Sequence, residues 1–460
     1  MMDGMRRFGW CAIVVCVGGV AACGDARDLN SDGPTGSSLE GSMDATEAAD
    51  SSPATADNSD AAAEVVPVAV RAAPGGSPGL AGESITEFGL DLFAQVRSHD
   101  VGANITVSPA SVAIALAMVE PGTVDAAREQ MRTLLRIDDP TAFHASMNAL
   151  EQDLEARTPG SFNEGDDPGE VTIDIANAAF LQKGYPFEPD YLDTVGWNYG
   201  PVLREVDFGP DPDGVAHEIN DFVADATNDQ IVDLIADGTL KAETVLALVN
   251  ALYLKASWLE TFDEAATTTQ SFTLLDDTTV DVALMNGTSS SSAVGDGWVA
   301  ATKSYVGGLS AQFILPDEGR FDEIAANLAT VLTDYELNRT DGTDLSVPRF
   351  ETRTSTELSP ALNALGLTAP YGPGGLLGIA NDPRLAIYAV IHEAFVAMDE
   401  DGTEAAAATV VLGYLVSGPP SPPVPVVLDR PFLYRIIDDT SGATLFVGQV
   451  TDPSTARQIR

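Results

Sequence analysis

The chain has 460 residues, which is enough for one large domain or two ordinary ones. It carries 69 acidic side chains against 23 basic ones, a formal net charge of −46. Such a chain repels phosphate and sulfate groups, which argues against nucleic acid, glycosaminoglycan and bare anionic membrane surfaces as partners. The three cysteines are Cys11, Cys16 and Cys23, so nothing folded after Cys23 can contain a disulfide, a cysteine metal site or a thiol nucleophile.

The first residues are typical of an export signal. Arg6 and Arg7 precede an apolar run over residues 8–20 that is too short to span a bilayer comfortably. The run ends in Val20-Ala-Ala-Cys23, which resembles a bacterial lipobox, the signal in which the cysteine sulfur is acylated before the leader is cut. We therefore predict a lipoprotein signal peptide over residues 1–22 and lipidation of Cys23. The protein is then expected to be exported, and either lipid-anchored to the bacterial cell envelope or extracellular. A plain signal peptide in which Cys23 is incidental is the alternative.

Residues 23–82 have the composition of a linker. The stretch consists mainly of Ala, Asp, Ser, Gly, Pro and Thr, and no aromatic residue occurs between Trp10 and Phe88. Such a segment cannot bury enough apolar surface to offset its chain entropy, so we expect a disordered acidic tether. The folded domain is then predicted to cover residues 83–460.

From Glu83 onward the sequence becomes periodic. Apolar residues at 85, 88, 92 and 96 keep helical spacing, and Ser108-Pro109 is typical of a helix start. Further helical patterns cover residues 214–235 and 320–335, and alternating patterns predict strands at 171–176, 246–254, 311–315, 386–390, 433–437 and 444–450. The mixture favours an α+β fold with a largely antiparallel or mixed sheet.

Five segments, in order and in register, resemble the serpin family. They are residues 104–116 (NITVSPASVAIAL), 175–180 (IANAAF), 249–258 (VNALYLKASW), 391–409 (IHEAFVAMDEDGTEAAAAT) and the pair 429–434 (DRPFLY) with 445–450 (LFVGQV). The resemblance covers roughly residues 83 to 453. It implies one domain with three β-sheets, about nine helices and an exposed reactive-centre loop at about residues 400–428.

The resemblance also implies a function. Serpins are suicide-substrate inhibitors of serine endopeptidases rather than enzymes, and they trap the acyl-enzyme when the cleaved loop inserts into the main sheet. It implies serine proteases as covalent partners, a monomer, no cofactor, no metal and no catalytic residue. Contact with a membrane is expected through the lipid anchor alone.

The residues that follow Gly402 are suited to insertion. Alternate side chains of a strand share one face, and the face that starts at Thr403 carries no charge, whereas Glu404 falls on the other face. Gly402 itself permits a bend. The predicted hinge comprises Gly402, Thr403, Glu404, Ala405, Ala406, Ala407, Ala408 and Thr409. An ordinary alanine-rich helix over residues 404–408 is the alternative that helix propensity alone favours.

The scissile bond is placed by the usual count in the family. Fourteen positions after Gly402 this count reaches Val416, followed by Ser417; Leu415 or Tyr414 take its place if the register slips. No Lys or Arg occurs between residues 410 and 429, which disfavours a trypsin-like target. An aliphatic or aromatic residue suits elastase-, subtilisin- or chymotrypsin-like pockets.

The resemblance assigns structural roles to seven further residues. Ser108, Ser111, Asn250 and His392 match the hydrogen-bonding cluster, the shutter, beneath the strands that must part. Trp258 matches the tryptophan at the breach, where insertion begins, and Glu400 and Arg349 match an ion pair at the base of the loop. If exposed, this pair contributes under about 1 kcal/mol. The remaining histidines, His99, His144 and His217, are expected at the surface.

Two other classes of function remain open at this stage. A non-inhibitory serpin-fold surface lipoprotein, acting as a binder or scaffold, would usually carry bulky or charged hinge residues, and this hinge has none on its insertable face. A hydrolase that uses a serine and one of the four histidines lacks a credible nucleophile motif. A covalent complex with a protease that survives SDS would distinguish the inhibitor from both.

Overall fold

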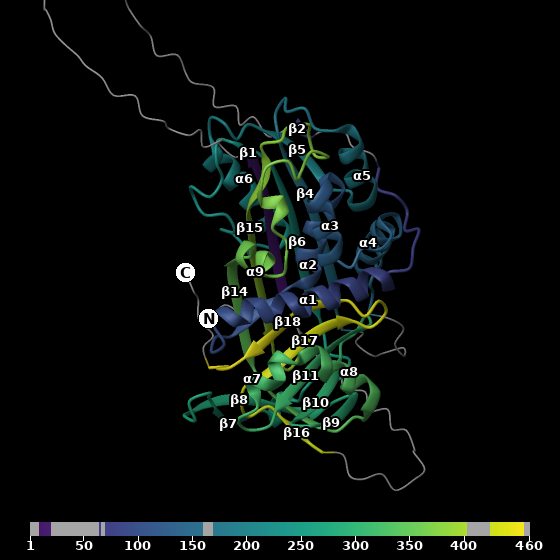
Figure 1. Cartoon of the computed structure of the whole chain (residues 1–460). Helices are drawn as coiled ribbons and strands as arrows, with labels where there is room; N and C mark the ends of the chain where they lie inside the picture. The colour runs from purple at the N-terminus through teal and green to yellow at the C-terminus, as the bar shows by residue number, and fades with distance from the viewer. Residues whose placement is uncertain (1–8, 20–63, 66–69, 160–168, 403–423, 455–460) are drawn as a thin grey trace, which may run out of the picture.

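The computed structural model describes residues 9–19, 64–65, 70–159, 169–402 and 424–454. Within these ranges the chain forms three β-sheets and nine α-helices (Figure 1). The α+β architecture with three sheets and nine helices that the sequence predicted is therefore confirmed.

The main sheet has seven strands, and its interior is buried on both faces. Its order is β14 (Phe350–Glu357), β15 (Leu385–Met398), β1 (Gly9–Gly19), β6 (Thr244–Ala256), β4 (Val171–Gln182), β5 (Val202–Val206) and β2 (Glu64–Val65). All neighbours are antiparallel except β4 and β5. The sequence of β6, TVLALVNALYLKA, is nearly continuous in apolar residues, as a strand covered on both faces requires.

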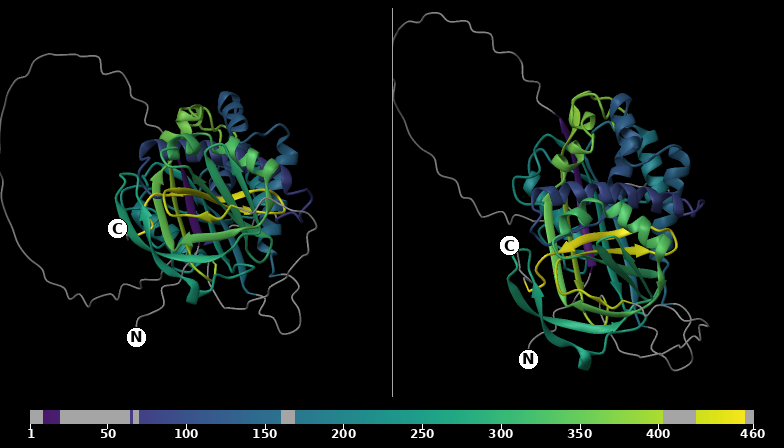
Figure 2. Two further views of the ribbon diagram at one scale, coloured as in Figure 1. Left: turned by 90° about the horizontal axis from the view of Figure 1, so that it is seen from below. Right: turned by 60° about the horizontal axis from the view of Figure 1, so that its bottom comes forward.

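The strand between β6 and β15 comes from the N-terminal apolar run, and we call this position the central slot. In Figure 1, β1 is the dark purple strand beside β6 and β15, and Figure 2 shows it inside the sheet from two further directions. Sequence analysis gave this run no place in the fold. That residues 1–22 are removed as a signal peptide stays a prediction. In the chain that retains them, residues 9–19 form an interior strand of the main sheet.

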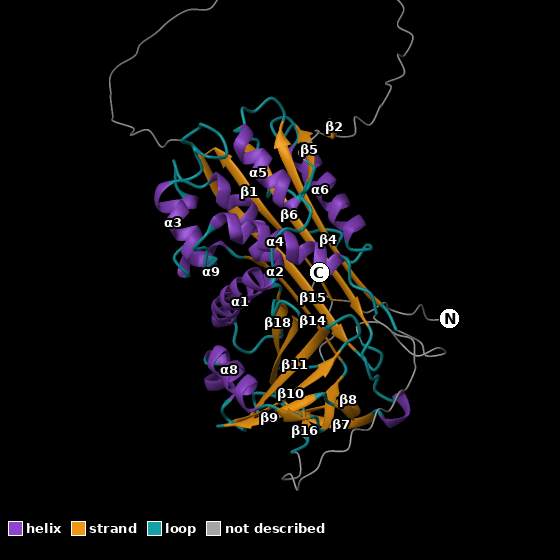
Figure 3. Cartoon of the chain, turned by 90° about the vertical axis from the view of Figure 1, so that its right-hand side faces the viewer, coloured by secondary structure: helices purple, strands orange, loops and turns teal. Residues whose placement is uncertain are grey.

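The other two sheets lie at the opposite end of the molecule from β5 and β2 (Figure 3). The second has the order β12 (Thr340–Asp341), β9 (Ser291–Gly295), β10 (Trp298–Ser304), β11 (Leu309–Pro316), β17 (Phe432–Asp438), β18 (Thr444–Val450) and β3 (Ile105–Val107). The third has the order β16 (Val426–Val427), β13 (Asp344–Pro348), β8 (Thr279–Thr288) and β7 (Thr268–Thr273). The predicted strands at 311–315, 433–437 and 444–450 are β11, β17 and β18.

Two hydrophobic clusters lie on opposite faces of the main sheet, and the nine helices of the described ranges pack around the three sheets. The helices are α1 (Gly79–His99), α2 (Pro109–Val119), α3 (Asp125–Leu134), α4 (Pro140–Glu155), α5 (Pro189–Tyr199), α6 (Pro212–Ala226), α7 (Phe321–Ala326), α8 (Leu328–Asn338) and α9 (Ser359–Ala364). Every side chain of α2 is buried, and this helix contacts β1 and β6. Apolar residues of α6, including Ile219 and Val223, form the smaller cluster with side chains of β1, β4 and β6.

Three boundaries differ from the sequence predictions. The helix expected at 214–235 ends at Ala226, because the following Asn228 and Asp229 take left-handed backbone angles. The helix expected at 320–335 is divided into α7 and α8 around Asn327. The linker expected over residues 23–82 ends earlier, since α1 begins at Gly79 and residues 70–78 are described.

Polar contacts explain the earlier end of the linker. Asn148 of α4 donates to the Ala72 carbonyl (3.1 Å), and Ser146 Oγ accepts from the Ala81 backbone (2.8 Å) and donates to the Ser77 carbonyl (2.7 Å). The composition of residues 70–82 predicted disorder because it offers little apolar surface to bury. In the structure, polar side chains of α4 instead form hydrogen bonds with the backbone of this segment. The rest of the predicted linker, apart from β2, lies outside the described residues.

A glycine in α1 gives a test of the helix packing. Helix propensity alone predicts that Gly89→Ala stabilises the protein by about 1 kcal/mol. A Cβ at Gly89 would, however, lie 2.3 Å from Pro109 Cβ, at the crossing of α1 and α2. We therefore expect Gly89→Ala to destabilise the fold by about 1–3 kcal/mol and to lower the thermal midpoint in a melt followed by circular dichroism. Ala94→Gly, on the exposed face of the same helix, is the matched control and should lose only the propensity of about 1 kcal/mol. A raised midpoint for Gly89→Ala would contradict this crossing.

Candidate functional site

Four residues that the resemblance assigned to the shutter lie together beneath the central slot. Ser108 caps α2, and its Oγ accepts from the Ser111 backbone N–H (3.3 Å). The Ser108 N–H donates to His392 Nε2 of β15 (3.2 Å), and Ser111 Oγ donates to Asn250 Oδ1 of β6. All four are fully buried, so the cluster joins α2 to both strands that flank the slot.

His392 also contacts the strand inside the slot. Its Nε2 accepts from Ser108, so the proton of the neutral ring is on Nδ1, which lies 3.2 Å from the carbonyl of Ala12 in β1. Burial lowers the pKa of His392 to about 4, and the hydrogen bond to Ala12 opposes part of this shift. At neutral pH the ring is an uncharged bridge between α2 and β1.

The polar cluster continues beyond the predicted residues, across the sheet to α4. Asn250 donates to Asn177 of β4 (3.0 Å), and Asn177 donates to Glu151 (2.7 Å), which also accepts from Arg71 (2.9 Å). Glu151 is fully buried, and burial raises its pKa to about 7 although Arg71 and Asn177 stabilise its charge. Sequence analysis missed these residues. Asn177 was visible as a lone amide in an apolar segment, but Arg71 had been assigned to the linker.

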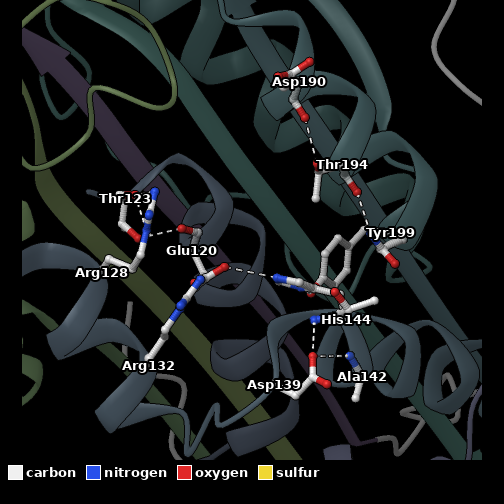
Figure 4. Close-up of polar contacts among 12 residues, drawn as sticks. Glu120, Thr123, Arg128, Arg132, Asp139, Ala142, His144, Asp190, Thr194 and Tyr199 are labelled. Carbon is white, nitrogen blue, oxygen red and sulfur yellow. Dashed lines mark hydrogen bonds and ion pairs between the residues drawn. The ribbon is translucent and has the colours of Figure 1, made fainter. Parts of the chain in front are cut away.

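His144 forms a second buried group and corrects the expectation of a surface position. It is 5% exposed; its Nδ1 lies 2.5 Å from the Tyr199 hydroxyl and its Nε2 3.1 Å from Glu120 Oε2 (Figure 4). Burial alone would raise the pKa of Glu120, but hydrogen bonds with His144 and Arg132 outweigh it and hold that pKa below its ordinary value. The group ties α3, α4 and α5 together. His99 and His217 are exposed, as expected.

Trp258 follows β6 and is held in place from two sides. Its ring stacks on Tyr305 with centroids 4.0 Å apart, and its indole N–H donates to the Asp399 carbonyl beyond the end of β15 (2.9 Å). The Lys303 ammonium lies near the same aromatic group, 5.7 Å from the centroid of the Trp258 ring and 4.4 Å from that of the Phe262 ring. Burial lowers the pKa of Lys303 to about 8. Trp258 therefore links the ends of the two strands that flank the slot.

Glu400 and Arg349 form the predicted ion pair, but not as an exposed one. The carboxylate is 2% exposed and accepts two hydrogen bonds from the guanidinium, both 2.5 Å long, and a third of 2.5 Å from Thr267 Oγ1. Burial alone would raise the pKa of Glu400, and these hydrogen bonds hold it below its ordinary value. Two parallel hydrogen bonds from one guanidinium make this pair stronger than a single exposed contact, although the Arg349 side chain is 37% exposed and the buried Glu400 carboxylate loses hydration.

Gly402 is the last described residue before the predicted reactive loop. Its φ is +127°, it bridges Ser257, and a Cβ here would lie 2.4 Å from the Ala256 carbonyl oxygen. Both the backbone angle and the close approach therefore require glycine. The chain is described again from Val424, and β16 pairs in parallel with β13 of the third sheet. The other predicted hinge and scissile-bond residues, and Cys23, lie outside the described residues: Thr403, Glu404, Ala405, Ala406, Ala407, Ala408, Thr409, Tyr414, Leu415, Val416 and Ser417.

Within the described part of the chain, no helix is both long and apolar enough to cross a membrane. No group of three or more His, Cys, Asp or Glu residues in those ranges could hold a metal ion.

Comparisons with known proteins agree with this arrangement. The family model described as Serpin (serine protease inhibitor) matches residues 83–453. Serpin B3 of Homo sapiens is 31% identical over 389 residues, which cover 81% of this chain and 99% of that protein. The leukocyte elastase inhibitor of Sus scrofa is 31% identical over 387 residues, covering 80% of this chain and 98% of that protein.

Solved structures show the same fold. An Arabidopsis serpin in its native stressed conformation has a TM-score of 0.70 at 24% identity, covering 83% of this chain and all of that one. Human thyroxine-binding globulin complexed with thyroxine has a TM-score of 0.68 at 25% identity, covering 82% of this chain and 99% of that one. With three sheets, nine helices in the described ranges and a family match from residue 83 to 453, this chain belongs to the serpin family.

Proposed function

We propose that the protein is a suicide-substrate inhibitor of serine endopeptidases that prefer apolar residues. The observation that carries this proposal is the position of Gly402. The loop continues directly from β15, and Gly402 bridges Ser257 just beyond the end of β6, so the loop starts at the mouth of the central slot. A segment that folded back from this point would run antiparallel to β15 and beside β6.

The residues after Gly402 suit that position. Thr403, Ala405, Ala407 and Thr409 form one uncharged face of small or β-branched side chains. Such a face enters a sheet without leaving a charge unpaired in the interior. The central slot accepts an extended strand of eleven residues in this structure, since β1 lies there with a partner on each side.

The chemistry begins as ordinary proteolysis. The serine oxygen of the protease bonds to the carbonyl carbon of Val416, the peptide bond to Ser417 breaks, and the new amine of Ser417 takes up the proton that the hydroxyl lost. The loop from Gly402 to Val416, joined to the protease by an ester, then enters the slot. Fourteen residues at about 3.3 Å each would carry the protease about 45 Å and distort its active site before water cleaves the ester.

The choice of target rests on the loop sequence. Val416, or Leu415 or Tyr414 in another register, would occupy an apolar specificity pocket, and no Lys or Arg occurs between residues 410 and 429. The name of the Sus scrofa relative, leukocyte elastase inhibitor, supports an elastase-like target. We further propose that the protein is an exported monomer, anchored through a lipid on Cys23 and free of other membrane contacts.

A non-inhibitory role remains the second candidate. The solved relative thyroxine-binding globulin is a serpin-fold protein that is named for a small ligand rather than for a protease. The uncharged hinge face of this chain favours the inhibitor over such a binder. The two candidates differ in what happens after the loop is cut.

The first test uses the chain that begins at Cys23, mixed with elastase-, subtilisin- and chymotrypsin-like proteases. We expect at least one of them to form a complex that survives SDS electrophoresis. Because an added central strand buries apolar surface on both faces, the loop-cleaved protein should also melt more than about 10 °C higher than the intact one. Cleavage without either a complex or a higher midpoint would favour the binder.

The second test concerns the face that inserts. Thr403→Arg places a charge on the uncharged face of the inserting strand, and an unpaired charge inside the sheet is costly by several kcal/mol. We expect this variant to fold normally but to be cleaved as a substrate, with the yield of covalent complex reduced more than about tenfold. Glu404→Arg is the matched control, because position 404 carries a charge already and this substitution leaves the uncharged face of Thr403, Ala405 and Ala407 unchanged. Equal loss in both variants, or retained inhibition by Thr403→Arg, would show that the faces are assigned wrongly.

A further inference from the structure

Residues 9–19 of the N-terminal run form β1 and occupy the central slot. β1 pairs with β15 from Trp10–Phe395 to Gly19–Leu385, and with β6 from Gly9–Leu254 to Gly18–Thr244. Both ladders are antiparallel, so the backbone groups that β6 and β15 turn towards each other are met by β1 rather than by any later part of the chain.

Both faces of β1 are buried. Cys11, Ile13, Val15 and Val17 join the large hydrophobic cluster to which α2 belongs. Ala12, Val14 and Cys16 join the smaller cluster beneath α6. All seven side chains are fully buried, which is the environment of an integral central strand rather than of a segment resting on the surface.

Polar groups of the shutter also contact β1. His392 Nδ1 lies 3.2 Å from the Ala12 carbonyl, so a shutter residue contacts the backbone of β1 directly. Burial raises the pKa of Cys11 to about 11 and that of Cys16 to about 12. Both thiols are therefore protonated and shielded while β1 is in place.

Only one strand can lie between β6 and β15, so β1 and the cleaved loop exclude each other. From these contacts we propose that the N-terminal run is an internal blocker: a chain that retains it in the central slot is cleaved by proteases as a substrate, and inhibition begins only when the run leaves the slot. The blocking effect rests on the proposed function, because only an inhibitor can be blocked. The occupancy of the slot by β1 does not depend on that function.

The composition of the two segments favours the blocker. Residues 8–20 carry no charge and include Trp10, Ile13, Val14, Val15 and Val17, whereas the inserting loop begins with the charged Glu404 and four consecutive alanines at 405–408. Larger apolar side chains bury more surface in the same position. A chain that keeps its leader is therefore expected to resemble a loop-inserted serpin before any protease has acted.

Removal of the leader gives the blocker a physical role. If residues 1–22 are cut away during export, the slot is vacated at the same time. The inhibitory form would then exist only beyond the membrane, while chains that still carry the leader could not trap proteases inside the cell.

The occupancy is tested with thiol chemistry in the full chain. In a Cys23→Ser background, Cys11 and Cys16 are the only thiols. We expect N-ethylmaleimide to modify them more than about a thousandfold more slowly in the native protein than in urea. Val70→Cys, at a position that is 85% exposed, is the control for unhindered reaction. Rapid native modification of Cys11 and Cys16 would overturn the inference whatever the inhibitory activity.

The blocking effect is tested by evicting the strand. Val14 lies in the smaller cluster, away from the shutter residues, so Val14→Arg should make the slot unfavourable for β1 without changing the shutter. Relative to the full-length wild type, we expect Val14→Arg to melt more than about 10 °C lower, to react at Cys11 and Cys16, and to form SDS-stable protease complexes. Val70→Arg is the matched control with an exposed arginine and should behave as the wild type.

The outcomes separate the inference from the proposed function. Complexes formed by Val14→Arg but not by the wild type support the blocker, and equal complex formation by both overturns it. Protected thiols in the wild type, with no complexes from either chain, refute the proposed function and support occupancy alone. If Val14→Arg fails to fold, the thiol rates of the wild-type chain still decide the occupancy.

Discussion

The central slot is the constraint on which the rest of the structure depends. β6 and β15 are each long, apolar and buried on both faces, and each presents a row of backbone donors and acceptors towards the other. Unpaired backbone groups in such an interior are costly, so the position between these strands must either be filled or be closed by a movement of the sheet. In the chain that keeps its N-terminal run, β1 fills this position and pairs with both strands.

The polar residues beneath the slot are best understood through the same constraint. A network from Ser108 through His392 to Ala12, and from Ser111 through Asn250 and Asn177 to Glu151, crosses an otherwise hydrophobic interior. Apolar packing does not distinguish one register from another, whereas hydrogen bonds of fixed direction do. The network therefore specifies where β6 and β15 stand relative to α2, and it includes whichever strand fills the slot.

Local sequence patterns predicted much of the fold, and the resemblance supplied its topology. The spacing of Ile85, Phe88 and Leu92 and the cap at Ser108 depend on neighbours in sequence, and the structure confirms both. The buried position of His144 and the burial of Glu400 could not be read in this way, because their partners lie on elements distant in the chain. The apolar run at residues 8–20 was interpreted as an export leader alone. A short apolar stretch is equally typical of an export leader and of a strand buried on both faces, and composition does not distinguish the two.

The two properties of residues 8–20 are linked by the physics of burial. An export leader is apolar along its whole length because it must enter a membrane, and a strand buried on both faces is apolar along its whole length because it meets no water. A serpin needs an open position for such a strand in order to store free energy, so any export leader attached to it is a candidate occupant. A tether of low apolar content, such as most of residues 24–63, separates the run from α1 without adding a second segment that could compete. In this proposal one segment serves both as export leader and as occupant of the central slot, so that its removal changes the state of the main sheet.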